Sequence, residues 1–242
     1  MKRITETGLA DGNTQLPLDI KLNDSSRFDN FHGGPNQELK QVLRRCADGS
    51  EREAVFFWGK SGSGKTHLLQ AACREAGERG HAAAYLPLHR NAEIPVRILD
   101  GFENLSLVCM DDIQAVAGLP EWEEAIFHLF NRLRERQLPF VATADCPPSG
   151  LALQLTDLVS RLGWGLVYPM QPLDDQARLE LLQLRARGRG LELPEETGRF
   201  LLSRYPRDLP ALCALLDRLD HASLAAQRRL TIPFVKTVLA GL

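Results

Sequence analysis

The sequence has no paired cysteines and no long apolar runs. Its five cysteines are scattered, and none belongs to a Cys-x-x-Cys pair, which argues against a disulfide framework or a structural zinc site. No apolar run reaches the roughly 18 residues that span a bilayer, and the N-terminus lacks the apolar core of a signal peptide. We therefore expect a cytoplasmic protein with no membrane association.

An excess of positive charge is also missing. Lysine and arginine number 29 against 31 acidic residues, for a net charge of −2, so nothing draws the whole chain to nucleic acid. The densest basic stretch is 185–189, and a solvated helix end is the favoured interpretation over a nucleic-acid patch. With 44% hydrophobic and 25% charged residues in 242, the chain is typical of a globular domain, alone or with a small appendage.

Apolar periodicity divides the chain into three parts. We interpret residues 1–26 as a flexible polar arm with one apolar island at 15–20. Residues 27–170 alternate short apolar runs with amphipathic stretches, which predicts an α/β domain whose parallel sheet is covered by helices on both faces. Residues 171–242 lack strand-like runs and predict a small all-helical lid domain. The expected strands are 54–58, 82–86, 105–110, 140–143 and 165–168, and the expected helices are 66–79, 121–137, 174–187, 195–205 and 207–222.

The strongest motif follows the first expected strand. It fits G-x-x-x-x-G-K-[ST] in full and opens the first expected helix, which is the context that a phosphate-binding loop requires. Glycines let backbone N–H groups surround phosphate oxygens, and the helix N-terminus adds positive potential. Lys65 is expected to pair with the β- and γ-phosphates and the Thr66 hydroxyl to ligate Mg²⁺. The expected binding residues of this loop are Gly59, Lys60, Ser61, Gly62, Ser63, Gly64, Lys65 and Thr66.

A second motif is an apolar strand that ends in two acids, Asp111 and Asp112. A phosphate-loop site needs a carboxylate at a neighbouring strand end to hold its metal, and Asp111 fits that need. Asp112 is placed to orient or deprotonate an attacking water. The 45 residues from Thr66 to Asp111 leave room for a helix, a strand and a second helix, an arrangement typical of AAA+ proteins.

The segment Asp111–Gln114 resembles the Walker B region of the bacterial initiator DnaA, and nearly the whole chain is similar, more closely, to the small DnaA-related Hda family. The segment Phe28–Asn36 resembles the part of the initiator that packs around the nucleotide base. The resemblance adds Asp145 as the first sensor, Arg161 as an arginine finger that acts in trans, and Arg207 as the lid sensor. The nucleotide-binding residues that it implies are Phe28, Phe31, Asn36 and His67.

The same resemblance implies partners. The island that contains Gln15, Leu16, Leu18 and Ile20 looks like the peptide with which the family binds the β sliding clamp of DNA polymerase III. The other implied partner is DnaA, whose bound ATP the family causes to be hydrolysed, as a negative regulator of replication initiation. No helix-turn-helix follows the lid in this sequence, so sequence-specific DNA binding is not expected. A homodimer or a higher oligomer stays open.

Several alternatives remain open on the sequence. Arg161 fits an ordinary salt-bridged arginine, and residues 15–20 fit a disordered tail with chance leucines. Asp112 stands where AAA+ enzymes carry glutamate, and its shorter reach favours weak or no intrinsic ATPase activity. The chain could nevertheless be a self-sufficient ATPase or helicase loader, or a module that merely holds ADP. Whether ADP or ATP is the ligand is likewise open.

Overall fold

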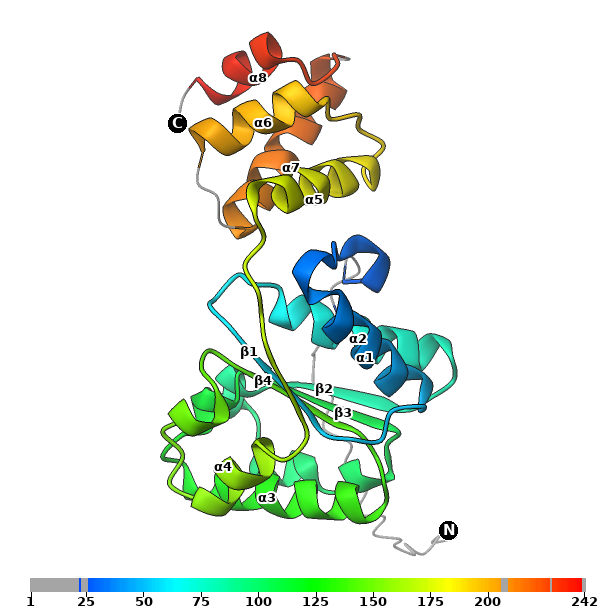
Figure 1. Ribbon diagram of the computed structural model, residues 1–242, viewed down its shortest axis with the longest axis vertical. Coiled ribbons are helices and arrows are strands. Elements are labelled where there is room, and N and C mark those ends of the chain that lie inside the picture. Colours follow the sequence, from blue (N-terminus) through cyan, green and yellow to red (C-terminus); the bar gives the residue numbers. More distant parts are fainter. Residues whose placement is uncertain (1–21, 23–25, 206–208, 227, 241–242) are drawn as a thin grey trace, which may run out of the picture.

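The computed structural model describes residues 22, 26–205, 209–226 and 228–240. It has an α/β domain below and a helical domain above in Figure 1. The strands are β1 (Val55–Trp58), β2 (Ala83–Pro87), β3 (Leu107–Asp111), β4 (Phe140–Ala144) and β5 (Leu166–Pro169). The helices of the α/β domain are α1 (Gln37–Asp48), α2 (Lys65–Glu78), α3 (Pro120–Glu135) and α4 (Thr156–Leu162). The helices of the second domain are α5 (Asp175–Arg187), α6 (Glu195–Arg204), α7 (Leu209–Ala226) and α8 (Ile232–Leu239).

The five strands form one sheet in the order β2-β3-β4-β1-β5, and every described pairing is parallel. Carboxyl ends of parallel strands meet at one edge. The loop after β1 and the acids after β3 therefore share that edge, with the end of β4 between them. This arrangement confirms the α/β class expected from the sequence and positions the site.

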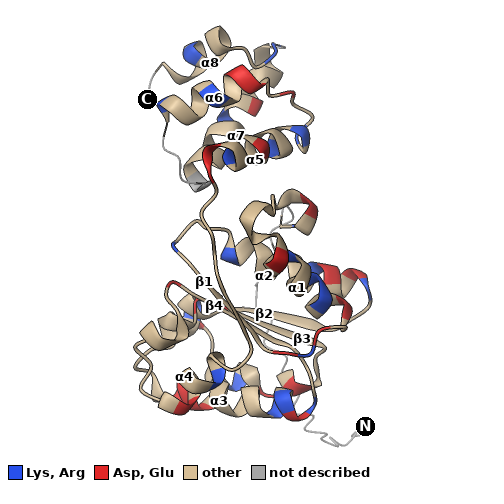
Figure 2. Cartoon of the chain, viewed as in Figure 1, with Lys and Arg blue, Asp and Glu red and all other residues tan. Residues whose placement is uncertain are grey.

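Side chains alternate along the central strands β1, β3 and β4 between two hydrophobic clusters. Phe57 and Cys109 pack with α1 and α2, whereas Phe56 and Met110 pack with α3 and α4. Both faces of these strands are therefore buried, which explains why they are largely apolar. The two helix pairs lie on opposite sides of the sheet in Figure 1. Lysine, arginine and the acids gather on the helices and connecting loops in Figure 2.

Local sequence signals set the helix ends. Gly49 ends α1 in the left-handed conformation, with φ of 77°, a conformation that glycine adopts without a steric penalty. Asp174 caps α5, because its carboxylate accepts a hydrogen bond of 2.7 Å from the backbone N–H of Ala177. The lid packs around its own core of leucines, which includes Leu182, Leu201 and Leu216.

The structure differs from the sequence expectations at several elements. The second helix expected between Thr66 and Asp111 is absent. The described residues there hold three short 3₁₀ helices instead, at Leu88–Glu93, Val96–Leu99 and Phe102–Asn104. Prolines at 87 and 95 help to break this segment into short turns, because proline cannot donate a helical hydrogen bond. Helices α1, α4 and α8 were not anticipated. No helix among the described residues is both long and apolar enough to cross a membrane.

Candidate nucleotide-binding site

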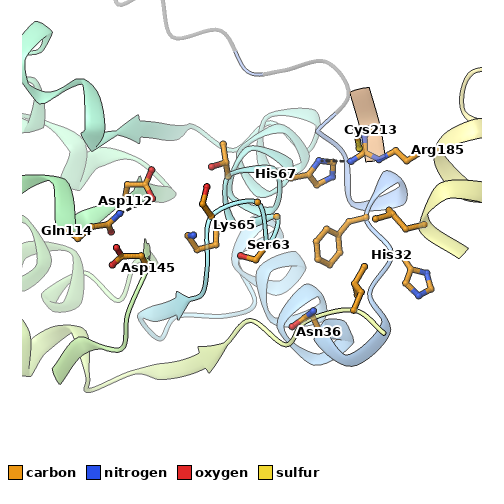
Figure 3. Close-up of a pocket in the computed structure, with 17 residues that line it drawn as sticks. His32, Asn36, Ser63, Lys65, His67, Asp112, Gln114, Asp145, Arg185 and Cys213 are labelled. Carbon is orange, nitrogen blue, oxygen red and sulfur yellow. Dashed lines mark hydrogen bonds between the residues drawn. The ribbon is translucent and has the colours of Figure 1, made fainter. Parts of the chain in front are cut away.

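A cavity of about 490 Å³ lies at the carboxyl edge of the sheet, between the loop after β1, the segment before α1 and the lid. Asp112, Gln114 and Asp145 lie together at one end in Figure 3, and Arg185 and Cys213 lie at the other. The residues that line it are Phe31, His32, Asn36, Ser61, Gly62, Ser63, Gly64, Lys65, Thr66, His67, Asp112, Gln114, Asp145, Leu173, Leu181, Arg185 and Cys213.

The loop between β1 and α2 requires glycine at several of its positions. Gly62 and Gly64 have φ of 76° and 98°, a region that side chains disfavour. A Cβ atom on Gly64 would come within 3.0 Å of the Phe31 ring, and one on Gly59 within 2.7 Å of the Met170 Cβ. The backbone therefore curls tightly around the space in front of α2, as a phosphate-binding loop does.

Lys65 lies at the centre of this loop and is buried. Its ammonium donates to the carbonyl oxygens of Gly59 at 2.7 Å and Lys60 at 3.3 Å. The hydroxyl oxygen of Ser63 is buried without a hydrogen-bond partner among the described atoms. A cation surrounded by loop backbone and an unpaired hydroxyl fit an anionic ligand, because both gain hydrogen bonds from phosphate oxygens. Gly59 and Lys60 themselves are not among the lining residues.

The two acids at the end of β3 occupy different environments. Asp111 is wholly buried beneath the cavity and does not line it. Its carboxylate accepts hydrogen bonds from the hydroxyls of Tyr85 at 2.9 Å and Thr143 at 2.5 Å. Asp112 lines the cavity and accepts a hydrogen bond of 3.2 Å from the Gln114 amide. Burial and the neighbouring Asp111 charge raise the pKa of Tyr85, so its hydroxyl keeps the proton that it donates.

The donor set fits Mg²⁺ better than a transition metal. Among the described residues no cluster of three His, Cys, Asp or Glu side chains could hold a metal. Magnesium needs few protein ligands, since it keeps several waters and binds substrate phosphates. Thr66 lines the cavity and Asp111 lies below it, so a hydroxyl and a carboxylate are available there.

The remaining sequence-predicted residues separate into three groups. Asp145 follows β4, is exposed and lines the cavity. Arg161, near the end of α4, lies outside the cavity, and its guanidinium stacks on Trp164 at 3.9 Å. Phe28 is buried in the core against α1 and α2 instead of facing the cavity. The four arm residues 15, 16, 18 and 20 and Arg207 lie outside the described residues.

Phe31 and Asn36 do line the cavity, but Asn36 has a structural task as well. Its side-chain amide donates to the carbonyl oxygen of Gln171 at 2.9 Å and accepts from the N–H of Gln171 at 2.8 Å. This pairing ties the segment before α1 to the connection between the two domains. His32 reaches the lid, where its Nε2 lies 3.4 Å from Glu180.

His67 joins three segments of the chain. Its ring stacks on Phe31, with centroids 5.8 Å apart, and its Nε2 lies 2.9 Å from the carbonyl oxygen of Arg27. Its Nδ1 lies 3.3 Å from the Arg185 guanidinium of the lid. Burial is the main cause that lowers the pKa of His67 to about 4, and Arg185 adds to it. The Nε of Arg185 is buried without a hydrogen-bond partner in the described structure.

Sequence reasoning missed the lid side of this cavity. Arg185 belongs to the basic stretch assigned to a solvated helix end, yet it lines the cavity and points toward His67 of α2. Leu181 precedes it by one helical turn on the same face of α5, and Cys213 comes from α7. The sequence does contain a signal for this face of the lid. Leu181 and Arg185 are four residues apart, a spacing that places both side chains on the same face of a helix.

A phosphate loop after β1, paired acids after β3 in a parallel sheet and a helical lid together define a P-loop protein of the AAA+ class. Family models support this assignment and refine it. The bacterial DnaA ATPase domain matches residues 22–169, and the Hda lid domain matches residues 175–239. The chain belongs to the DnaA-related family and carries a lid of the Hda type.

Solved structures of DnaA and of another AAA+ protein are also similar to this chain. Domain III of DnaA from Thermotoga maritima is 25% identical, with a TM-score of 0.78, and the alignment covers 91% of this chain and 98% of that one. AMPPCP-bound DnaA from Aquifex aeolicus is 24% identical over 84% of this chain and 67% of that one, with a TM-score of 0.70. The RuvB branch migration motor of Thermotoga maritima, at 16% identity, covers 89% of this chain and 74% of that one with a TM-score of 0.66, and shares the fold.

Proposed function

We propose that this chain binds ADP or ATP in the cavity and uses the bound state to stimulate hydrolysis of ATP on DnaA, as a negative regulator of replication initiation. One observation carries the nucleotide part. The loop around Lys65, the segment around Phe31 and the lid residue Arg185 line a single cavity. Similarity to a DnaA solved with AMPPCP supports an adenine nucleotide as the ligand.

Within that site we assign roles to the chain's own residues. The loop amides and Lys65 bind the β- and γ-phosphates. Thr66 and Asp111 are the residues that would hold Mg²⁺, which neutralises phosphate charge when bound. Asp112 orients a water, Asp145 acts as the first sensor and Arg207 as the lid sensor. The short side chain of Asp112, already paired with Gln114, favours weak or no turnover by the protein alone.

The trans role rests on the position of Arg161. The guanidinium lies outside its own cavity, which supports a role in the site of another chain. Stacking on Trp164 at 3.9 Å and on Phe127 at 5.9 Å holds it by cation–π contact. Its Nη1 is buried without a hydrogen-bond partner among the described atoms. A guanidinium of this kind neutralises transition-state charge on a neighbour's phosphates.

The decisive experiment measures hydrolysis of DnaA-bound ATP in the presence of clamp, DNA and this protein. Arg161→Ala is expected to lower the stimulated rate by about 1,000-fold or more, to the unstimulated level. Arg134→Ala is the matched control, since Arg134 also stacks on Trp164, at 4.6 Å, and is expected to keep the stimulation. Full stimulation with Arg161→Ala would refute the finger. Rapid ATP turnover by the purified protein alone would favour a self-sufficient ATPase or helicase loader.

The clamp contact is a separate part of the proposal. Residues 15–20 group two leucines and an isoleucine within a mostly polar arm, and apolar side chains of this kind bind an apolar groove on a partner. Combined Gln15→Ala and Leu18→Ala substitutions are expected to abolish capture by immobilised clamp. Capture at the wild-type level would remove the clamp from the proposal and leave nucleotide binding intact. The cytoplasmic location and a homodimer remain predictions.

A further inference from the structure

A buried run of hydrogen bonds outside the cavity ends on Asp111. Tyr85 on β2 donates its hydroxyl proton to one carboxylate oxygen at 2.9 Å, and Thr143 on β4 donates to the other at 2.5 Å. The Thr143 oxygen also accepts the backbone N–H of Asp112 at 3.0 Å. Two strands on either side of β3 therefore fix both oxygens of this carboxylate.

The run continues from Tyr85 toward the N-terminal segment. The side chain of Gln70, on α2, lies beside the Tyr85 hydroxyl. The Gln70 carbonyl oxygen in turn accepts a hydrogen bond of 3.0 Å from the Ser26 hydroxyl. Ser26 and Gln70 are both buried, so these contacts form away from water, where an unpaired polar group is costly.

We propose that the hydroxyls of Tyr85 and Thr143 are positioning groups that aim Asp111 at Mg²⁺, and that Gln70 and Ser26 hold Tyr85 in place for this task. The inference rests on the proposed function, because it concerns the metal of the same site.

Two physical arguments support it. Each carboxylate oxygen has more than one lone-pair direction, so it can accept a hydroxyl proton and still face a magnesium-bound water. Partners behind a metal ligand fix its orientation, and their loss commonly costs about 10- to 100-fold in metal affinity.

A purely structural role makes a different prediction, and the chain contains a matched control. Tyr168 on β5 donates its hydroxyl to the Glu38 carboxylate at 3.0 Å. Like Tyr85 it is a partly buried strand tyrosine paired with an acid, but Glu38, in the first turn of α1, is not an assigned metal ligand. If the Tyr85 hydroxyl supplied only stability, Tyr85→Phe and Tyr168→Phe would lower the free energy of unfolding and leave magnesium dependence unchanged.

The test is calorimetric titration of the nucleotide-free full chain with ATP, once with Mg²⁺ and once with EDTA. The ratio of the two affinities measures the magnesium enhancement. Tyr85→Phe is expected to lower that ratio by about 10- to 100-fold and to leave the affinity in EDTA unchanged. Ser26→Ala is expected to lower it less, and Tyr168→Phe not at all. If Tyr85→Phe does not fold, Thr143→Val replaces it, with recovery expected in Thr143→Ser.

The outcomes separate the two proposals. An unchanged ratio in folded Tyr85→Phe, beside an enhancement in the wild type, overturns the positioning role and leaves nucleotide binding standing. If the wild type binds ATP with the same affinity in Mg²⁺ and in EDTA, this inference and the metal assignment are both overturned. A wild type that binds no ATP in either buffer overturns the proposed function itself.

Discussion

The contacts of His67 predict a specific sensitivity to acid. Its Nε2 faces the carbonyl oxygen of Arg27, which can only accept, and its Nδ1 faces the Arg185 guanidinium, which can only donate. The ring must therefore be neutral, with its proton on Nε2. A second proton on Nδ1 would meet the N–H of a cation in a buried place, so acid is expected to separate the lid from α2.

The size of this effect follows from the pKa. Burial, with help from Arg185, lowers the pKa of His67 from 6.5 to about 4. A histidine whose pKa is lower in the folded state stabilises the fold fully above the unfolded pKa and loses that contribution as pH falls toward the folded value. At 1.36 kcal/mol for each pH unit, the total is about 3 kcal/mol, of which about 2 kcal/mol is lost by pH 5.

The assay is urea unfolding of the wild type and His67→Gln at about pH 7.5 and about pH 5. Glutamine can donate and accept in the same pocket but does not titrate. The wild type is expected to lose about 2 kcal/mol more than His67→Gln between the two pH values. His128→Gln, at an exposed position on α3, is the control and should follow the wild type. Equal losses in the wild type and His67→Gln would refute the neutral, buried ring.

Two further variants test the site and its support. Arg185→Ala is expected to weaken ADP binding about tenfold or more in calorimetry, because a charged donor to the ligand is lost. Arg187→Ala, exposed on the same helix, should bind ADP like the wild type, and equal affinities for all three proteins would exclude Arg185 from the site. Glu123 is buried and accepts the N–H groups of Gly118 at 2.8 Å and Leu155 at 2.7 Å. Glu123→Ala should therefore lower the free energy of unfolding by about 2–4 kcal/mol in urea, and a loss near zero would contradict the role of this buried carboxylate as a loop anchor.

The sheet could be predicted because each strand is specified by its own residues and by those that directly follow it. The runs 54–58 and 105–110 are short, largely apolar and followed by glycine or acids, and strands lie there at Val55–Trp58 and Leu107–Asp111. The loop that begins at Gly59 could also be predicted, because its conformation requires the glycines that the sequence contains. Helix α1 also had a readable pattern, since Leu39, Val42, Leu43 and Cys46 are all buried on one face. Helix α4, with seven residues, is too short for periodicity to reveal.

The unpredicted parts depend on contacts between distant segments. Asp111 was expected to hold the metal, but its hydrogen bonds with hydroxyls from β2 and β4 were not expected, because sequence spacing does not reveal neighbours in a sheet. Arg185 lies 118 positions from the histidine that it contacts. Phe28 belongs to a segment assigned to the base, and the position of its ring in the core depends on how α1 and α2 pack.

The most direct test of the whole account is calorimetric titration of the nucleotide-free chain with ADP in the presence of magnesium. The account predicts saturable heat for the wild type and loss of that heat for Lys65→Ala, with both proteins folded by circular dichroism. The buried ammonium of Lys65, now bonded to the carbonyl oxygens of Gly59 and Lys60, is the group expected to turn to the phosphates. A folded wild type that gives no heat with ADP, or a Lys65→Ala variant that binds with wild-type affinity, would contradict it.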